Sequence, residues 1–202
     1  MQLLLIRHAL PLRVDDAGGP ADPALSTTGL EQAERLAVGL AGEAIDAVWS
    51  SPMRRARETS GPLAGALGLD VTVDDDLAEF DRELSFYVPM EQIRGTDDPR
   101  WAQLVEEWSS AETEADRRAF RAKVVAAVER VVAASPGQRV AVVCHGGVIN
   151  AYLSHILDIE RTLFFEPDYT SVNRVLASRA GHRQLVSANE TPHLGRPPGD
   201  AT

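Results

Sequence analysis

Short apolar runs alternate along the chain with segments that repeat apolar residues at helical spacing. The runs at residues 3–6 and 140–144 are continuous, as expected of strands buried on both faces of a parallel sheet. Helical spacing is clearest at residues 30–40 and 120–131. This alternation predicts a doubly wound α/β fold with a mostly parallel sheet.

Local signals suggest where the expected helices begin and end. Thr28 and Glu31 stand three apart and fit a capping box, and Ser51 before Pro52 fits an N-cap followed by proline at the first helical position. We expect the helix after Ser51 to run towards Leu67, with a kink at Gly61-Pro62. A further helical pattern is expected at 101–108, separated from the helix at 120–131 by the polar run 109–116. The other expected elements are strands at 47–49, 71–73, 172–177 and 184–187 and a helix at 148–157.

The chain has the size and composition of a single globular domain. It has 202 residues, 44% of them hydrophobic, with neither an internal repeat nor a linker that would divide it. We expect one catalytic domain at residues 1–190. The segment 191–202 is rich in proline, glycine and polar residues and is expected to be a disordered tail.

Charge and cysteine content restrict the partners and the compartment. A net charge of −10 argues against nucleic acid or an anionic membrane as the main partner. No apolar stretch approaches the roughly 20 residues that cross a bilayer, and no signal peptide is recognisable. Cys144 is the single cysteine, so no intramolecular disulfide can form. We expect a cytoplasmic protein, and the oligomeric state stays open, a homodimer included.

Two histidines follow the two most apolar runs. Arg7-His8 comes directly after residues 3–6, and His145 comes directly after 140–144. Ligands of open α/β sheets bind at the carboxyl ends of the strands. We therefore expect the two histidines to lie in one site.

Five segments, in this order, resemble the histidine phosphatase superfamily, the phosphoglycerate mutase-like group. They span roughly residues 3 to 150, and the ordered set is far more specific than an isolated Arg-His pair. The segments are LIRHA at 5–9, LSTTGLEQA at 25–33, SSPMRRARET at 50–59, LAE at 77–79 and VCHGG at 143–147.

The resemblance implies a three-layer α/β/α sandwich and chemistry through a phosphohistidine on His8. A neutral imidazole is a good nucleophile, and the guanidinium groups of Arg7 and Arg55 can neutralise the phosphoryl oxygens. His145 matches the second histidine of the family, a donor to those oxygens. Glu79 matches its acidic residue and is the candidate general acid.

Some of these assignments have competitors in the sequence. Asp81 and Glu83 lie close to Glu79 and could be the proton donor instead. Arg54 and Arg57 flank Arg55, so a solvated basic helix face is the alternative there. His155, His182 and His193 match no motif and are read as structural or surface residues. The histidines have no metal-ligand spacing, so neither a metal nor another cofactor is expected.

The chain departs from the family pattern near the first motif and after Glu79. Ala9 stands where many members have glycine, and Pro11 and Val14 replace a polar threonine and asparagine. Arg13, or the backbone of residues 12–19, could restore the lost donor. The segment 80–87 also differs from the continuation found in many phosphatases.

The expected activity is hydrolysis of a small phosphorylated metabolite. Phosphoglycerate mutase-type transfer is one alternative. A phosphate-binding regulatory module without turnover is the other, although such a module would need neither a nucleophile nor an acid.

Overall fold

The computed structural model describes residues 1–89, 92 and 111–195. The helical pattern expected at 101–108 lies outside these residues. Within them the chain forms one six-stranded sheet in the order β3-β2-β4-β1-β5-β6. Its strands are β1 (Gln2–Arg7), β2 (Ala47–Ser50), β3 (Val71–Val73), β4 (Arg139–Cys144), β5 (Val172–Ala177) and β6 (Arg183–Glu190).

The central part of the sheet is parallel. β1 pairs with β4, β4 with β2, and β2 with β3, all in parallel register. β5 pairs antiparallel with both β1 and β6. The carboxyl ends of β1, β2, β3 and β4 therefore meet at one edge, and the predicted mostly parallel sheet is confirmed.

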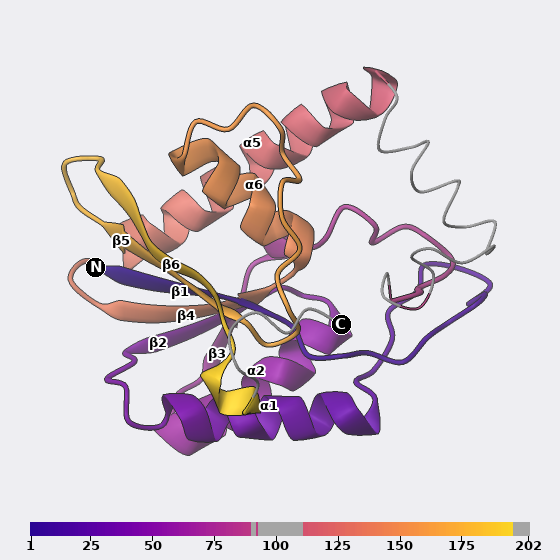
Figure 1. The fold of residues 1–202 in the computed structure, drawn as a ribbon, viewed down its shortest axis with the longest axis horizontal. Helices are drawn as coiled ribbons and strands as arrows, with labels where there is room; N and C mark the ends of the chain where they lie inside the picture. Colours follow the sequence, from indigo (N-terminus) through magenta and orange to yellow (C-terminus); the bar gives the residue numbers. More distant parts are fainter. Residues whose placement is uncertain (90–91, 93–110, 196–202) are drawn as a thin grey trace.

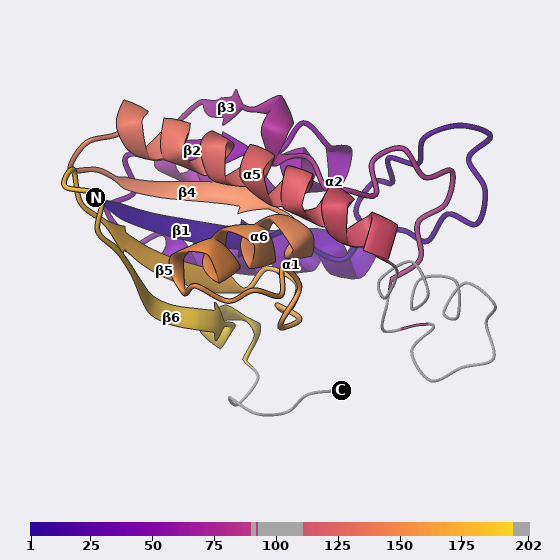
Figure 2. The same cartoon turned by 90° about the horizontal axis from the view of Figure 1, so that it is seen from above.

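Helices cover both faces of this sheet (Figures 1 and 2). α1 (Thr27–Leu40) and α2 (Arg54–Leu67) lie on one face, and α5 (Ala111–Ala134) and α6 (Gly146–Ile156) lie on the other. The three-layer sandwich is confirmed. A short 3₁₀ turn, η1 (Asp75–Leu77), follows β3.

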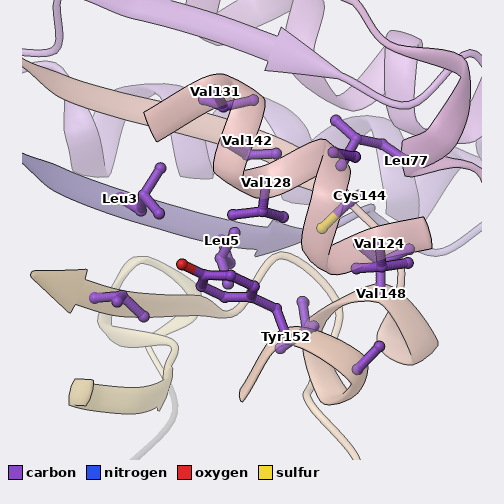
Figure 3. Packing of buried hydrophobic residues seen from close by; sticks show 14 of the residues in the cluster. Leu3, Leu5, Leu77, Val124, Val128, Val131, Val142, Cys144, Val148 and Tyr152 are labelled. Atoms are coloured by element: carbon purple, nitrogen blue, oxygen red, sulfur yellow. The ribbon is translucent and has the colours of Figure 1, made fainter. Parts of the chain in front are cut away.

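The apolar side chains of the strands pack against both helical layers. Leu3 and Leu5 of β1 pack with Val128 of α5 and Tyr152 of α6, as Figure 3 shows. Leu4 and Ile6 belong to the cluster that contains helices α1 and α2. Because residues 3–6 are all buried by one layer or the other, the sequence shows a continuous run instead of alternation.

Two expected helix starts are each wrong by two residues. Ser26, and not Thr28, caps α1: its Oγ accepts a hydrogen bond from Gly29 N at 3.0 Å and donates one to the Leu10 carbonyl at 2.9 Å. Ser51 Oγ accepts from Met53 N at 3.2 Å, but α2 begins at Arg54 and not at Pro52. The helix then continues through Pro62 to Leu67.

The helix expected at 120–131 begins earlier, inside the polar run at 109–116. α5 is helical from Ala111 onward, through most of that run. Alanine and glutamate, which are good helix formers, occupy four of the positions 111–116, and the run contains neither glycine nor proline. Polarity alone is therefore a poor sign of a helix break.

The expected boundary of the disordered tail, at residue 191, lies too early in the sequence. Residues 191–195 contain the 3₁₀ turn η2 (Pro192–Leu194), which contacts α1. His193 Nε2 lies 2.9 Å from Thr170 Oγ1, and burial lowers the pKa of His193. His193 is thus structural, as expected, and it ties the segment to the domain. Residues 196–202 lie outside the described part.

Among the helices described, none combines the length and the apolar content that a membrane crossing requires.

Candidate active site

The two histidines sit side by side at the carboxyl edge of the sheet. His8 follows β1 and His145 follows β4, the neighbouring strand. Their ring centroids are 5.1 Å apart, and both side chains are buried. The structure thus brings together two residues that are 137 positions apart in sequence.

The surroundings of His8 fix which ring nitrogen carries the proton. Nδ1 lies 2.8 Å from the carbonyl oxygen of Ala9. A carbonyl oxygen can only accept, so Nδ1 is protonated and the lone pair resides on Nε2. Burial, and then the charges of Arg55 and Arg7, lower the pKa of His8 well below its usual value of 6.5. His8 is therefore a neutral imidazole with a free lone pair, the form that a nucleophile requires.

His145 is held in a complementary form. Its Nε2 lies 2.7 Å from Ser51 Oγ, which already accepts a hydrogen bond from Met53 N. The arrangement favours Ser51 as donor to Nε2 and places the proton of the neutral ring on Nδ1. Nδ1 is buried and has no partner within the described residues. Burial, followed by Arg55 and His8, lowers the pKa of His145, so the ring is neutral.

Arg55 lies in the first turn of α2 and is 1% exposed. Its Nη2 is 3.2 Å from Asp81 Oδ1, whereas Nε and Nη1 are buried without a partner in the part of the chain described. Thr59, one turn later, donates to the Arg55 carbonyl and accepts from Ala9 N. Thr59 therefore joins the helix that carries Arg55 to the backbone beside His8.

Tyr169 positions Arg7. The Arg7 guanidinium carbon lies 3.9 Å from the centre of the Tyr169 ring, and Nη1 donates to the Pro167 carbonyl at 2.6 Å. Tyr169 also lies beside His8, with ring centroids 5.7 Å apart. The next residue, Thr170, has a positive φ of 58° and donates its N–H to the Arg7 carbonyl. This strained backbone holds the tyrosine against the arginine.

Glu79 reaches the same site from the segment after η1. Its Oε2 accepts from Gly147 N at 2.8 Å and its Oε1 accepts from Phe80 N at 3.0 Å. Burial, reinforced by the nearby charge of Asp81, raises the pKa of Glu79 to about 7. A carboxyl group with that pKa can both donate and accept a proton near neutral pH.

The two competing acids occupy different places. Asp81 lines the cavity but bonds to Arg55. Glu83 is 77% exposed and pairs with Arg82 on the surface. Of the three, Glu79 is the buried one, and its pKa is raised. Arg54 points away to Glu58, so the basic face has one buried member, Arg55.

The departures near the first motif leave the backbone undisturbed. Ala9 is not among the described residues with a positive φ, so it needs no glycine, and it packs with Leu25 and Ala33. The backbone of Val14 pairs with that of Tyr87 in both directions. Arg13 pairs with Asp15 at 2.7 Å. The suggested replacement of the lost donor by Arg13 or residues 12–19 is not seen, because the described cavity wall contains no residue from 9–25.

A cavity of about 490 Å³ opens at the candidate active site. The site residues Arg7, His8, Arg55 and Glu79 line it together with Tyr87. The Tyr87 ring packs 4.7 Å from the Arg55 guanidinium carbon. Burial raises the pKa of Tyr87, and the charges of Arg55 and Arg7 and a hydrogen bond with Tyr169 oppose that rise. Sequence analysis missed Tyr87 and Tyr169 as site residues because neither belongs to a motif.

A substitution at Gly147 can test the position of the Glu79 carboxyl group. A Cβ atom at residue 147 would lie 2.2 Å from Glu79 Oε1, whereas one at residue 146 would have no neighbour closer than 3.8 Å. We expect Gly147→Ala to displace the carboxyl group and lower kcat/KM by about 10²-fold or more, the usual effect of losing a general acid. Gly146→Ala is the matched control and should lower it far less. Equal effects of the two variants on phosphatase kinetics would contradict this geometry.

Comparison with known proteins assigns the family. The model of the histidine phosphatase superfamily (branch 1) matches residues 3–191. The chain belongs to the histidine phosphatase superfamily. A curated relative of this histidine phosphatase, phosphoserine phosphatase 1 of Hydrogenobacter thermophilus, is 28% identical over 201 residues, which cover 96% of this chain and 95% of the relative.

Solved structures show the same fold. A mutant phosphoserine phosphatase from Entamoeba histolytica in complex with phosphoserine superposes with a TM-score of 0.72 at 22% identity, covering 96% of this chain and 98% of that one. A mycobacterial glucosyl-3-phosphoglycerate phosphatase gives a TM-score of 0.72 at 24% identity, covering 94% and 99%. These structures show that the chain has the histidine phosphatase fold. The family match and the curated relative identify it as an enzyme of the phosphatase type.

Proposed function

We propose that this histidine phosphatase hydrolyses a small phosphomonoester through a phosphohistidine on His8, with Glu79 as general acid and general base. The observation that carries the proposal is that a neutral His8 and a carboxyl group of pKa about 7 line one cavity together with two arginines. The named relatives act on phosphoserine and glucosyl-3-phosphoglycerate, which agrees with a small phosphorylated metabolite as substrate.

In the first step Nε2 of His8 attacks phosphorus and the bond from phosphorus to the alcohol oxygen breaks. Glu79 gives its proton to that oxygen, so the product leaves as a neutral alcohol. Positive charge develops on the imidazole ring, and the Ala9 carbonyl stabilises it through the Nδ1 proton. Arg7, Arg55 and His145 donate to the phosphoryl oxygens.

The second step reverses these roles. The Glu79 carboxylate takes a proton from water, and the water oxygen attacks the phosphohistidine. The phosphorus–nitrogen bond breaks, inorganic phosphate leaves, and His8 returns to its neutral form with the proton on Nδ1. Glu79 is again protonated, so the cycle consumes only ester and water.

A panel of small phosphate esters, followed by phosphate release, tests this function. We expect turnover that depends on His8. Transfer of the phosphoryl group to a second alcohol in preference to water would favour the mutase alternative. Tight binding of phosphate esters with no turnover would favour the regulatory module.

Independence from metal is a further prediction. Arg7, Arg55 and His145 can supply the charge neutralisation that Mg²⁺ gives in other phosphoryl transfer enzymes. Phosphatase activity should therefore persist after treatment with EDTA and gel filtration. Loss on chelation that one specific divalent ion restores would contradict this assignment of the two arginines and His145.

The pH dependence follows from Glu79 and His8. Glu79 acts in its protonated form in the first step, so kcat/KM for an alkyl phosphate should fall as the pH rises through about 7. The pKa of His8 is lowered, so the nucleophile stays neutral well below pH 6.5. Protonation of His8 should therefore not lower kcat/KM between pH 6.5 and 7. Glu79→Gln should remove the alkaline limb of the profile. An unchanged alkaline limb in that variant would assign it to another group.

A further inference from the structure

The cavity extends well beyond the groups that would hold a phosphoryl moiety. Its volume of about 490 Å³ lies in the range of pockets for whole small molecules, about 300–1,000 Å³. Arg7, His8, Arg55 and Glu79 are among its lining residues. The lining also contains phenylalanine and leucine side chains from two segments, 80–88 and 163–167.

One apolar wall is built on a buried asparagine. The side-chain oxygen of Asn150 in α6 accepts from Phe164 N at 2.9 Å and from Phe165 N at 3.1 Å. Its side-chain nitrogen donates to the Phe165 and Gly146 carbonyls, both at 2.8 Å. The two phenylalanine rings contact each other, with centroids 5.0 Å apart. The helix that begins after His145 therefore fixes this wall.

The second wall is fixed from outside the site. Phe80 is 48% exposed and packs edge to face on Phe120 of α5, with centroids 5.8 Å apart. Leu84 and Phe86 follow it along the wall. The Leu84 carbonyl accepts from Ala21 N at 2.7 Å, and Tyr87 pairs with Val14. The loop that departs from the family pattern at Val14 thus supports an apolar wall.

Charged groups are poorly placed to select a polar alcohol. Asp81 is bonded to Arg55, and the two other charged lining residues, Arg161 and Glu166, are exposed to solvent. Among the described lining residues, no buried charged side chain lies outside the proposed phosphoryl site. An amino acid or sugar alcohol would gain little in the apolar part, whereas a hydrocarbon body would be removed from water.

We propose that the preferred substrate is a phosphomonoester whose alcohol carries an apolar body, above all an aromatic ring, seated between the Phe80–Val88 wall and the Phe164–Phe165 wall. The proposal rests on the proposed function and adds the class of the leaving alcohol. It differs from the phosphoserine named for two of the relatives.

Three esters of similar leaving-group chemistry test it. Ethyl phosphate and 2-phenylethyl phosphate differ by a ring that takes no part in bond breaking, and O-phosphoserine carries polar charges in its place. Burial of one aromatic ring supports a gain of about 10- to 100-fold in kcat/KM for 2-phenylethyl phosphate over ethyl phosphate. O-Phosphoserine should not exceed ethyl phosphate by that factor. Equal values for the two alkyl esters, or a clear preference for O-phosphoserine, would overturn the proposal.

Two variants locate the effect. Phe86→Ala and Phe164→Ala, one on each wall, should each lower the ratio of the two kcat/KM values by about tenfold. Leu176→Ala changes a residue that is 44% exposed on β5, away from the cavity, and should leave the ratio unchanged. Ratios unchanged in both phenylalanine variants would contradict the placement. Turnover without a ring preference refutes this proposal alone, whereas no turnover of any ester refutes the proposed function.

Discussion

Replacing His8 with alanine is expected to lower kcat by a factor on the order of 10⁴ or more, because the variant has no nucleophile to form the covalent intermediate. Arg7, Arg55 and His145 stay in place and still bind phosphate. KM should therefore change much less than kcat. The measurement is steady-state phosphate release with an alkyl and an aryl ester.

His182→Ala is the control for this variant. His182 is exposed in the turn between β5 and β6 and is not part of the cavity wall. Thermal unfolding of both variants separates loss of chemistry from loss of fold, since His8 is buried. A folded His8→Ala protein with full activity would refute covalent catalysis at this residue.

Glu79→Gln should show a loss that depends on the leaving group. An alkoxide needs a proton as it departs, so alkyl esters should slow by about 10²–10⁴-fold. An activated aryl ester releases a stable phenolate and should slow much less in the first step. Glutamine keeps the shape of the side chain and can still accept the Gly147 hydrogen bond, but its NH2 group cannot accept from Phe80 N. The dependence on the leaving group, and not the size of the loss, therefore reports the proton.

The neighbouring acids provide matched controls. Glu83→Gln changes an exposed side chain and should have no effect. Asp81→Asn removes a charge that raises the pKa of Glu79, so the alkaline limb should move to lower pH without selectivity for the leaving group. If either variant shows the selective loss while Glu79→Gln resembles the wild type, the proton donor has been assigned to the wrong residue.

The sheet could be predicted because its sequence signal is strong and local. Residues 3–6 and 140–144 are apolar throughout, and only strands covered on both faces require this. The site histidines could then be placed, because the ends of neighbouring parallel strands meet at one edge. Arg55 and Glu79 came from motif order, and the structure brings both to the cavity.

The remaining features depend on contacts between distant segments. Ser26 caps α1 in place of Thr28 because the Leu10 carbonyl accepts its hydroxyl proton, a tertiary contact that no local pattern shows. Tyr169 packs on Arg7, and Asn150 binds the backbone of Phe164 and Phe165. Neither residue has a motif around it. Such residues need the folded chain to be recognised.

The loop at residues 11–21 shows how a departure from a family pattern can mislead. The sequence suggested a weakened phosphate pocket at Val14. In the structure the Val14 backbone supports Tyr87, whose ring packs on Arg55. The loop contributes through its backbone, which a comparison of side chains does not detect.

Trapping the covalent intermediate is the most direct test of the account. The enzyme is mixed with a rapidly turned over aryl phosphate, quenched in alkali within the first turnover, digested and analysed by mass spectrometry. Covalent catalysis at His8 predicts one phosphorylated peptide carrying the modification on His8, stable in alkali, lost in acid and missing from His8→Ala. A phosphoryl group on another residue, or burst kinetics without modification of His8, would contradict it.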